Sequence, residues 1–134
     1  MRALQNLLDL VHHNFQYTPD IVSSGKLENW SPLPADIPDG FQLRDDCEGF
    51  AMYCRLLIMR DLPQYKTQLI ICKILGEGHC ILRVTSDTEE YFLDNRYKTI
   101  MTLDQLVREG YVFMLASGYQ PGDPYYWVVA EKNT

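Results

Sequence analysis

The sequence has no run of basic residues and little basic charge overall. Its 134 residues include 12 Lys and Arg against 18 Asp and Glu, which gives a formal net charge of −6. A protein that binds the phosphates of a nucleic acid, or that docks on anionic lipid, needs a basic face. We therefore expect no nucleic acid and no anionic membrane surface among the partners of this chain.

The sequence also lacks a long apolar stretch. No segment approaches the roughly 18–20 apolar residues that a membrane-spanning helix requires. Polar residues interrupt the apolar ones throughout the first eleven residues, so this segment does not have the composition of a signal peptide. We expect no membrane span and a cytoplasmic location.

Paired cysteine motifs are absent as well. Cys47, Cys54, Cys72 and Cys80 form no CxxC pair and no spacing typical of small secreted proteins or zinc sites. We expect four reduced thiols in a reducing compartment. With 46% hydrophobic residues, a chain of this length can fold as a single domain over residues 1–134 without disulfides or zinc.

The N-terminal half is predicted to hold two helices with a loop between them. Apolar residues at helical spacing predict an amphipathic helix over the first dozen residues. Residues 19–40 contain several prolines and predict a long loop, of the kind that usually lines a functional cleft. Residues 44–60 predict a central buried helix, with Arg55 and Arg60 suited to its C-terminal half.

The C-terminal half reads mainly as β-structure. Residues 67–75, 79–85 and 90–96 predict an antiparallel meander, because β-rich runs alternate there with short turn segments. Residues 103–108 predict a short helix. Two further strands are expected, at residues 111–116 and 125–130. The fold class that follows is α+β, with a central helix packed on an antiparallel sheet.

Cys47 is the cysteine whose position suggests chemistry. It stands at the start of the central helix, where unpaired N–H groups and the helix dipole favour a thiolate. Asp45, Asp46 and Glu48 oppose this effect, because they disfavour further negative charge nearby. A reactive Cys47 therefore needs a partner that can take its proton.

His79 and Asp94 are the candidate partners, and one strand register connects them. In an antiparallel hairpin, the residue numbers of any two facing residues add up to the same value, which we call the index sum. A turn at residues 86–87 makes this sum 173. The register pairs His79 with Asp94 and also brings together an apolar pair and an opposite-charge pair. In the alternative interpretation, His79 only caps a strand and Asp94 belongs to a turn.

With these residues in place, the chain resembles the bacterial transglutaminase-like cysteine peptidases of the transglutaminase/papain-like superfamily. The resemblance covers roughly residues 11–117. It rests on the segments NFQY (14–17), WSP (30–32), DCEGFA (46–51), GHCIL (78–82) and FLDN (92–95). It implies a papain-like/transglutaminase-like core in which the helix carries the cysteine and the sheet carries the histidine and the aspartate.

The resemblance also implies a mechanism that needs no cofactor. Cys47 would be the nucleophile, His79 the general base and then acid, and Asp94 the carboxylate that orients His79. A thioester formed from a protein or peptide substrate would then be hydrolysed. The N–H of Cys47 would hold the oxyanion with a second donor, for which Trp30 is the candidate; a purely packing role for Trp30 is an equal alternative.

Some relatives that cleave adhesins bind calcium through acids beside the nucleophile. Asp46 and Glu48 match that pattern, and the resemblance thus allows a calcium ion at these two residues. Two carboxylates are few for an ion that takes six to eight oxygen ligands. The alternative is that Asp46 caps the helix and Glu48 complements its dipole.

Three functional questions stay open at this point. Acyl transfer to an amine, as in transglutaminases and arylamine N-acetyltransferases, would use the same residues as hydrolysis. A non-catalytic binding or assembly module could keep the same fold. Relatives usually carry a signal peptide and are longer, so we do not transfer export or adhesin cleavage; a host enzyme and a phage-encoded protein both fit.

Overall fold

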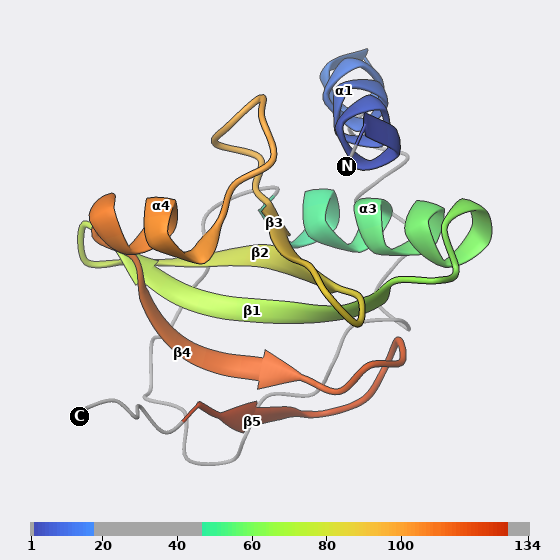
Figure 1. The fold of residues 1–134 in the computed structure, drawn as a ribbon. Coiled ribbons are helices and arrows are strands. Elements are labelled where there is room, and N and C mark those ends of the chain that lie inside the picture. The colour runs from blue at the N-terminus through green and yellow to red at the C-terminus, as the bar shows by residue number, and fades with distance from the viewer. Residues whose placement is uncertain (1, 18–46, 129–134) are drawn as a thin grey trace.

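The computed structural model describes residues 2–17 and 47–128 (Figure 1). The predicted loop at 19–40, and with it Trp30, Asp45 and Asp46, lies outside the described residues. The helices are α1 (Arg2–Tyr17), α3 (Cys47–Asp61) and α4 (Leu103–Arg108). The strands are β1 (Lys66–Ile74), β2 (Glu77–Thr85), β3 (Glu90–Leu93), β4 (Val112–Ser117) and β5 (Tyr125–Trp127). No helix in this part of the chain has the length and apolar character needed to cross a membrane.

The strands form one antiparallel sheet in the order β3-β2-β1-β4-β5. The predicted meander is confirmed as β1–β2–β3, and the predicted final pair of strands forms the β4–β5 hairpin. β3 is shorter than predicted and ends at Leu93, because a turn closed by the Tyr97 N–H on the Asp94 carbonyl oxygen (3.0 Å) follows it. The α+β class expected from the sequence is confirmed.

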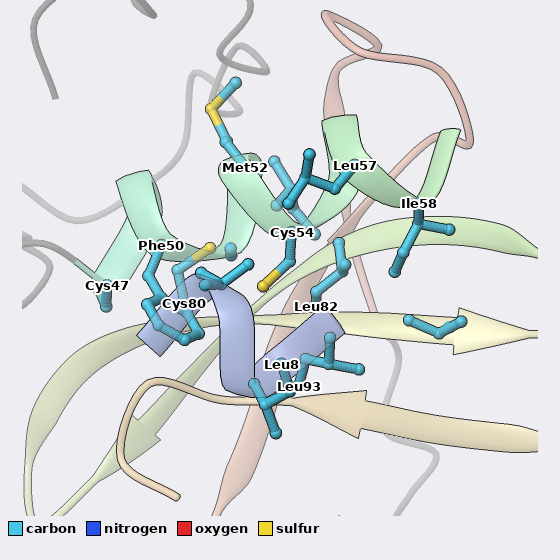
Figure 2. Packing of buried hydrophobic residues seen from close by; sticks show 14 of the residues in the cluster. Leu8, Cys47, Phe50, Met52, Cys54, Leu57, Ile58, Cys80, Leu82 and Leu93 are labelled. Atoms are coloured by element: carbon cyan, nitrogen blue, oxygen red, sulfur yellow. The ribbon is translucent and has the colours of Figure 1, made fainter. Parts of the chain in front are cut away.

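Both faces of the sheet are covered. On one face, α1 and α3 pack against alternate residues of β1 and β2, and Leu4, Leu8 and Ile58 are fully buried there. Figure 2 shows side chains of α3 packed with Leu82 of β2, Leu93 of β3 and Leu8 of α1. A second cluster, which includes Leu106 of α4, covers the other face. This two-sided burial explains why β1 reads as a nearly continuous apolar run.

The register predicted for β2 and β3 is wrong by two residues. The structure pairs Leu82 with Leu93 and Thr85 with Glu90, which gives an index sum of 175 rather than 173. The connection is a four-residue loop, residues 86–89, closed by the Ser86 N–H on the Glu89 carbonyl oxygen (2.9 Å). A shift of two keeps every side chain on its predicted face, because the side-chain period of a strand is two.

Candidate active site

The candidate site lies at the end of β2 that β3 leaves uncovered. β3 pairs only with residues 82–85 of β2. Among the described residues, 77–81 of β2 therefore have no strand partner on that side. His79 and Cys80 lie in this open stretch, Asp94 follows directly after β3, and Cys47 begins α3, which packs on β2. His79 and Asp94 are in contact at this end of β2, and Cys47 contacts the main chain of Cys80, the residue next to His79.

His79 and Asp94 are in direct contact and have no solvent exposure. His79 Nε2 lies 2.7 Å from Asp94 Oδ1, and both side chains are 0% exposed. They do not face each other across the hairpin as predicted. They are diagonal neighbours, and a histidine and an aspartate are long enough to bridge that offset. The predicted contact is confirmed, although the register used to predict it is wrong.

The contacts of Asp94 determine the tautomer of His79. The Arg96 main-chain N–H also donates to Asp94 Oδ1 (2.9 Å), and the Tyr111 hydroxyl donates to Oδ2. A carboxylate that accepts these bonds can only accept from His79 too, so Nε2 carries the hydrogen. Nδ1 is then the ring nitrogen that does not contact Asp94. It is buried and has no hydrogen-bond partner in the part of the chain that the structure describes.

Cys47 is 1% exposed and lies against the main chain of β2. Burial raises the pKa of its thiol to about 11, the charges of Glu48 and Asp94 add to the increase, and main-chain hydrogen bonds at Cys80 and Glu48 lower it. Cys80 is the residue next to His79, so these contacts place the Cys47 sulfur at the open stretch of β2. A thiol with this pKa is protonated at neutral pH and needs a base before it can attack.

The other three cysteines are packing residues, as predicted. Cys54, Cys72 and Cys80 are at most 1% exposed. Burial is the main cause that raises each of their pKa values, and the pKa values of Cys54 and Cys72 are raised further than that of Cys47. The Cys72 thiol donates to the His79 carbonyl oxygen (3.4 Å). Cys47 is therefore easier to deprotonate than Cys54 or Cys72.

Comparison with known proteins identifies the family. The model of the bacterial transglutaminase-like cysteine proteinases matches residues 1–134 of the chain. The chain belongs to this family. Family membership makes it a cysteine peptidase, which acts on a protein substrate. No curated protein sequence matches it.

Solved structures of LapG from Legionella pneumophila share the fold of this bacterial transglutaminase-like cysteine proteinase. The EGTA-treated structure matches with a TM-score of 0.53 at 14% identity and covers 96% of this chain and 69% of LapG. A second LapG structure matches with a TM-score of 0.52 at 14% identity and covers 96% and 71%. A calcium-bound LapG structure matches with a TM-score of 0.45 at 16% identity and covers 95% and 82%. The papain-like/transglutaminase-like fold expected from the sequence is confirmed.

Of the two predicted calcium ligands, the structure describes only Glu48. This side chain is partly buried in the first turn of α3, and burial raises its pKa to about 7. No group of three His, Cys, Asp or Glu side chains that could hold a metal occurs among the described residues. A desolvated carboxylate is a suitable ligand for a cation, but a calcium site would need most of its oxygens from other parts of the chain or from water.

Two residues of the site were not predicted from the sequence. Tyr111 donates its hydroxyl hydrogen to Asp94, and Arg96 donates through Nη1 to the Tyr111 hydroxyl (3.2 Å). Tyr111 was expected only as the start of a strand. The available signal was weak: a tyrosine after Gly110, at the end of a predicted helix, does not reveal which distant carboxylate its hydroxyl meets.

Proposed function

We propose that this cysteine peptidase cleaves amide bonds through a thioester formed on Cys47, with His79 as the base and Asp94 as the group that orients His79. The observation that carries the proposal is the bond from His79 Nε2 to Asp94, which leaves Nδ1 buried and without a hydrogen-bond partner among the described residues. A base in that state can accept a proton from a neighbouring thiol. The main-chain contact of Cys47 at Cys80, beside His79, supports Cys47 as that thiol.

The raised pKa of Cys47 indicates when the proton moves. At about 11 it makes the resting thiol neutral at physiological pH. We infer that His79 Nδ1 removes the proton as the sulfur attacks the substrate carbonyl, and that the imidazolium then protonates the leaving amine. A water molecule, deprotonated by His79, completes hydrolysis of the thioester. The Cys47 N–H at the start of α3 is the first candidate donor to the oxyanion, and Trp30 remains the candidate for the second.

Alkylation by iodoacetamide tests this assignment without a known substrate. The alkylated cysteine would be identified by peptide mass spectrometry, at pH 7, in wild type, Cys47→Ala, His79→Ala and Cys54→Ala. We expect Cys47 to react fastest of the four thiols and His79→Ala to slow that reaction at least ten-fold, because general-base assistance is worth about 10²–10⁴-fold. Cys54→Ala is the matched control and should react like wild type at Cys47.

Two results would contradict the proposal. The first is equal labelling of wild type and Cys47→Ala, which would show that another thiol is the reactive one. The second is an unchanged Cys47 rate in His79→Ala, which would remove His79 as the base. Either result would favour a non-catalytic role for these residues within the fold.

We also propose that Asp46 and Glu48 bind a calcium ion. Its support is the resemblance of the Asp46–Cys47–Glu48 segment to calcium-binding relatives and the desolvated carboxylate of Glu48, whose negative charge a cation would stabilise. Calcium should then raise the melting temperature of wild type and leave that of Glu48→Gln unchanged. The same increase in both proteins, or none in wild type, would exclude Glu48 as a ligand.

A further inference from the structure

The Asp94 carboxylate is held on both of its oxygens, and only one of its partners is the proposed base. Oδ1 accepts from His79 Nε2 (2.7 Å) and from the Arg96 main-chain N–H (2.9 Å). Oδ2 accepts from the Tyr111 hydroxyl. Asp94 has no solvent exposure, so no bulk water can replace a lost donor. The orientation of the carboxylate towards His79 therefore depends on how firmly Oδ2 is held.

The end of α4 fixes the position of Tyr111. Gly110 adopts a φ of +93°, and the Tyr111 N–H bonds the Leu106 carbonyl oxygen (3.1 Å) while the Gly110 N–H bonds that of Val107 (3.0 Å). This is the Schellman arrangement, in which a glycine with positive φ ends a helix and sets the direction of the next residue. The Tyr111 side chain is only 5% exposed, and its ring lies edge-on to His79 with the centroids 6.1 Å apart.

Arg96 determines which way the Tyr111 hydroxyl points. Its Nη1 donates to the Tyr111 oxygen at 3.2 Å, and its guanidinium lies 5.6 Å from the centre of the Tyr111 ring. Because the oxygen accepts from Arg96, the hydroxyl hydrogen is free to point at Asp94. Burial, followed by the hydrogen bond to Asp94, raises the pKa of Tyr111, so the hydroxyl keeps its hydrogen and remains a donor.

We propose that Tyr111, held by Arg96, is a positioning residue that keeps the Asp94 carboxylate aligned with His79. The proposal rests on the function assigned above to Cys47, His79 and Asp94. Without the Tyr111 hydroxyl, Oδ2 would be a buried anionic oxygen that lacks a donor, a state that proteins avoid. The carboxylate would turn towards another donor, and His79 would lose the partner that stabilises its imidazolium.

The experiment compares Tyr111→Phe with wild type by two measurements. In protein labelled with ¹⁵N-histidine, the proton on His79 Nε2 should give a strongly downfield resonance, because it lies in a short, buried bond to a carboxylate. This resonance is assigned by its loss in His79→Ala. We expect Tyr111→Phe to shift it upfield or broaden it, and to slow iodoacetamide alkylation of Cys47 at pH 7 about ten-fold, the size of effect that loss of a hydrogen bond to a charged group gives.

A matched control removes a different tyrosine hydroxyl. Tyr91 also donates to a carboxylate, Glu89 Oε2 (3.3 Å), but it lies on β3 beside the hairpin loop. Tyr91→Phe should keep the wild-type resonance and alkylation rate. If Tyr111→Phe does not fold, Arg96→Met replaces it in the experiment. Arg96 is exposed, and the variant keeps the main-chain N–H that bonds Asp94. Arg96→Met should shift the His79 resonance in the same direction as Tyr111→Phe.

The outcomes separate this inference from the proposed function. A wild-type resonance and an equal or faster alkylation rate in a folded Tyr111→Phe would overturn the positioning role, even if His79→Ala slows alkylation as expected. The same would follow from an unchanged resonance in Arg96→Met when Tyr111→Phe is unfolded. If His79→Ala itself reacts at the wild-type rate, the proposed function fails, whereas the resonance still reports whether Tyr111 positions Asp94.

Discussion

Glu48 is the residue whose charge most directly affects Cys47. It follows the cysteine in the first turn of α3, and its negative charge is one of the causes that raise the Cys47 pKa. Burial raises the pKa of Glu48 itself to about 7, so near neutral pH the carboxyl is protonated in a large fraction of molecules. The sequence predicts that the charge of Glu48 disfavours a thiolate at Cys47. Because the carboxyl is often protonated, this effect is weaker than a full negative charge would give.

The raised pKa of Glu48 predicts a pH dependence of stability. The folded protein holds this proton up to about pH 7, whereas the unfolded chain releases it near 4.5. Unfolding therefore releases a proton between these values, and the free energy of unfolding should fall as pH rises from 4.5 to 7, by about 1–3 kcal/mol after allowance for partial solvent exposure. Glu48→Gln, which carries no charge, should lack this decrease.

Urea unfolding at pH 5 and pH 7.5, in buffer with a calcium chelator, measures the effect. The comparison is the difference between the two pH values in wild type and in Glu48→Gln. Glu109→Gln removes an exposed carboxylate at the end of α4 and should behave like wild type. An identical pH dependence in wild type and Glu48→Gln would show that the Glu48 carboxylate is ionised in the folded protein throughout this range.

At the scale of secondary-structure elements, local chemistry decides where sequence prediction succeeds. The predicted helix at 103–108 matches α4 at both ends. A capping box of Thr102 and Gln105 begins it and Gly110 follows its end, and all of these signals lie within the segment itself. The end of β3 is different, since the turn at Asp94 that follows it also brings that side chain to His79 and Tyr111, which lie on distant segments of the chain.

The β2–β3 hairpin shows which part of a register the sequence determines. Side chains alternate between the two faces of a strand, and His79 and Asp94 share a face, as the predicted pairing requires. The alternation is the same for index sums of 173 and 175, so the pattern cannot distinguish them. The loop of residues 86–89 decides between them, and its closing bond joins two main-chain groups that the side-chain pattern does not reveal.

At the scale of the whole molecule, Arg55 joins α3 to the sheet. The sequence suggests a role for it in complementing the helix dipole, but the side chain is fully buried. It donates to Thr67 of β1 at the hydroxyl (3.1 Å) and at the carbonyl oxygen (3.3 Å), and to the Gly118 carbonyl oxygen after β4 (2.8 Å). Burial lowers its pKa. These bonds fix the helix that carries Cys47 relative to the strands.

Arg55→Met should therefore destabilise the whole domain. The variant keeps a long apolar side chain but leaves the buried acceptors of Thr67 and Gly118 without this donor. We expect the free energy of unfolding, measured by urea titration, to fall by about 2–4 kcal/mol.

The matched control for this change lies on the same helix. The Arg60 side chain is 68% exposed and pairs with the adjacent Asp61 (2.7 Å), an arrangement that contributes little to stability. Arg60→Met should leave the unfolding midpoint unchanged within error. Equal midpoints for the two variants would contradict a structural role for the Arg55 bonds.

The sequence by itself determined the elements, the α+β class and the identity of Cys47, His79 and Asp94 as candidates. It could do so because side-chain periodicity, caps and turn residues act over a few positions along the chain. The tertiary structure alone decided that β3 ends early, that Tyr111 and Arg96 hold Asp94, and that burial sets the pKa values of Cys47 and Glu48. These features arise where distant segments exclude water from the same small volume, and a charge or a hydrogen bond there depends on neighbours that the local sequence does not specify.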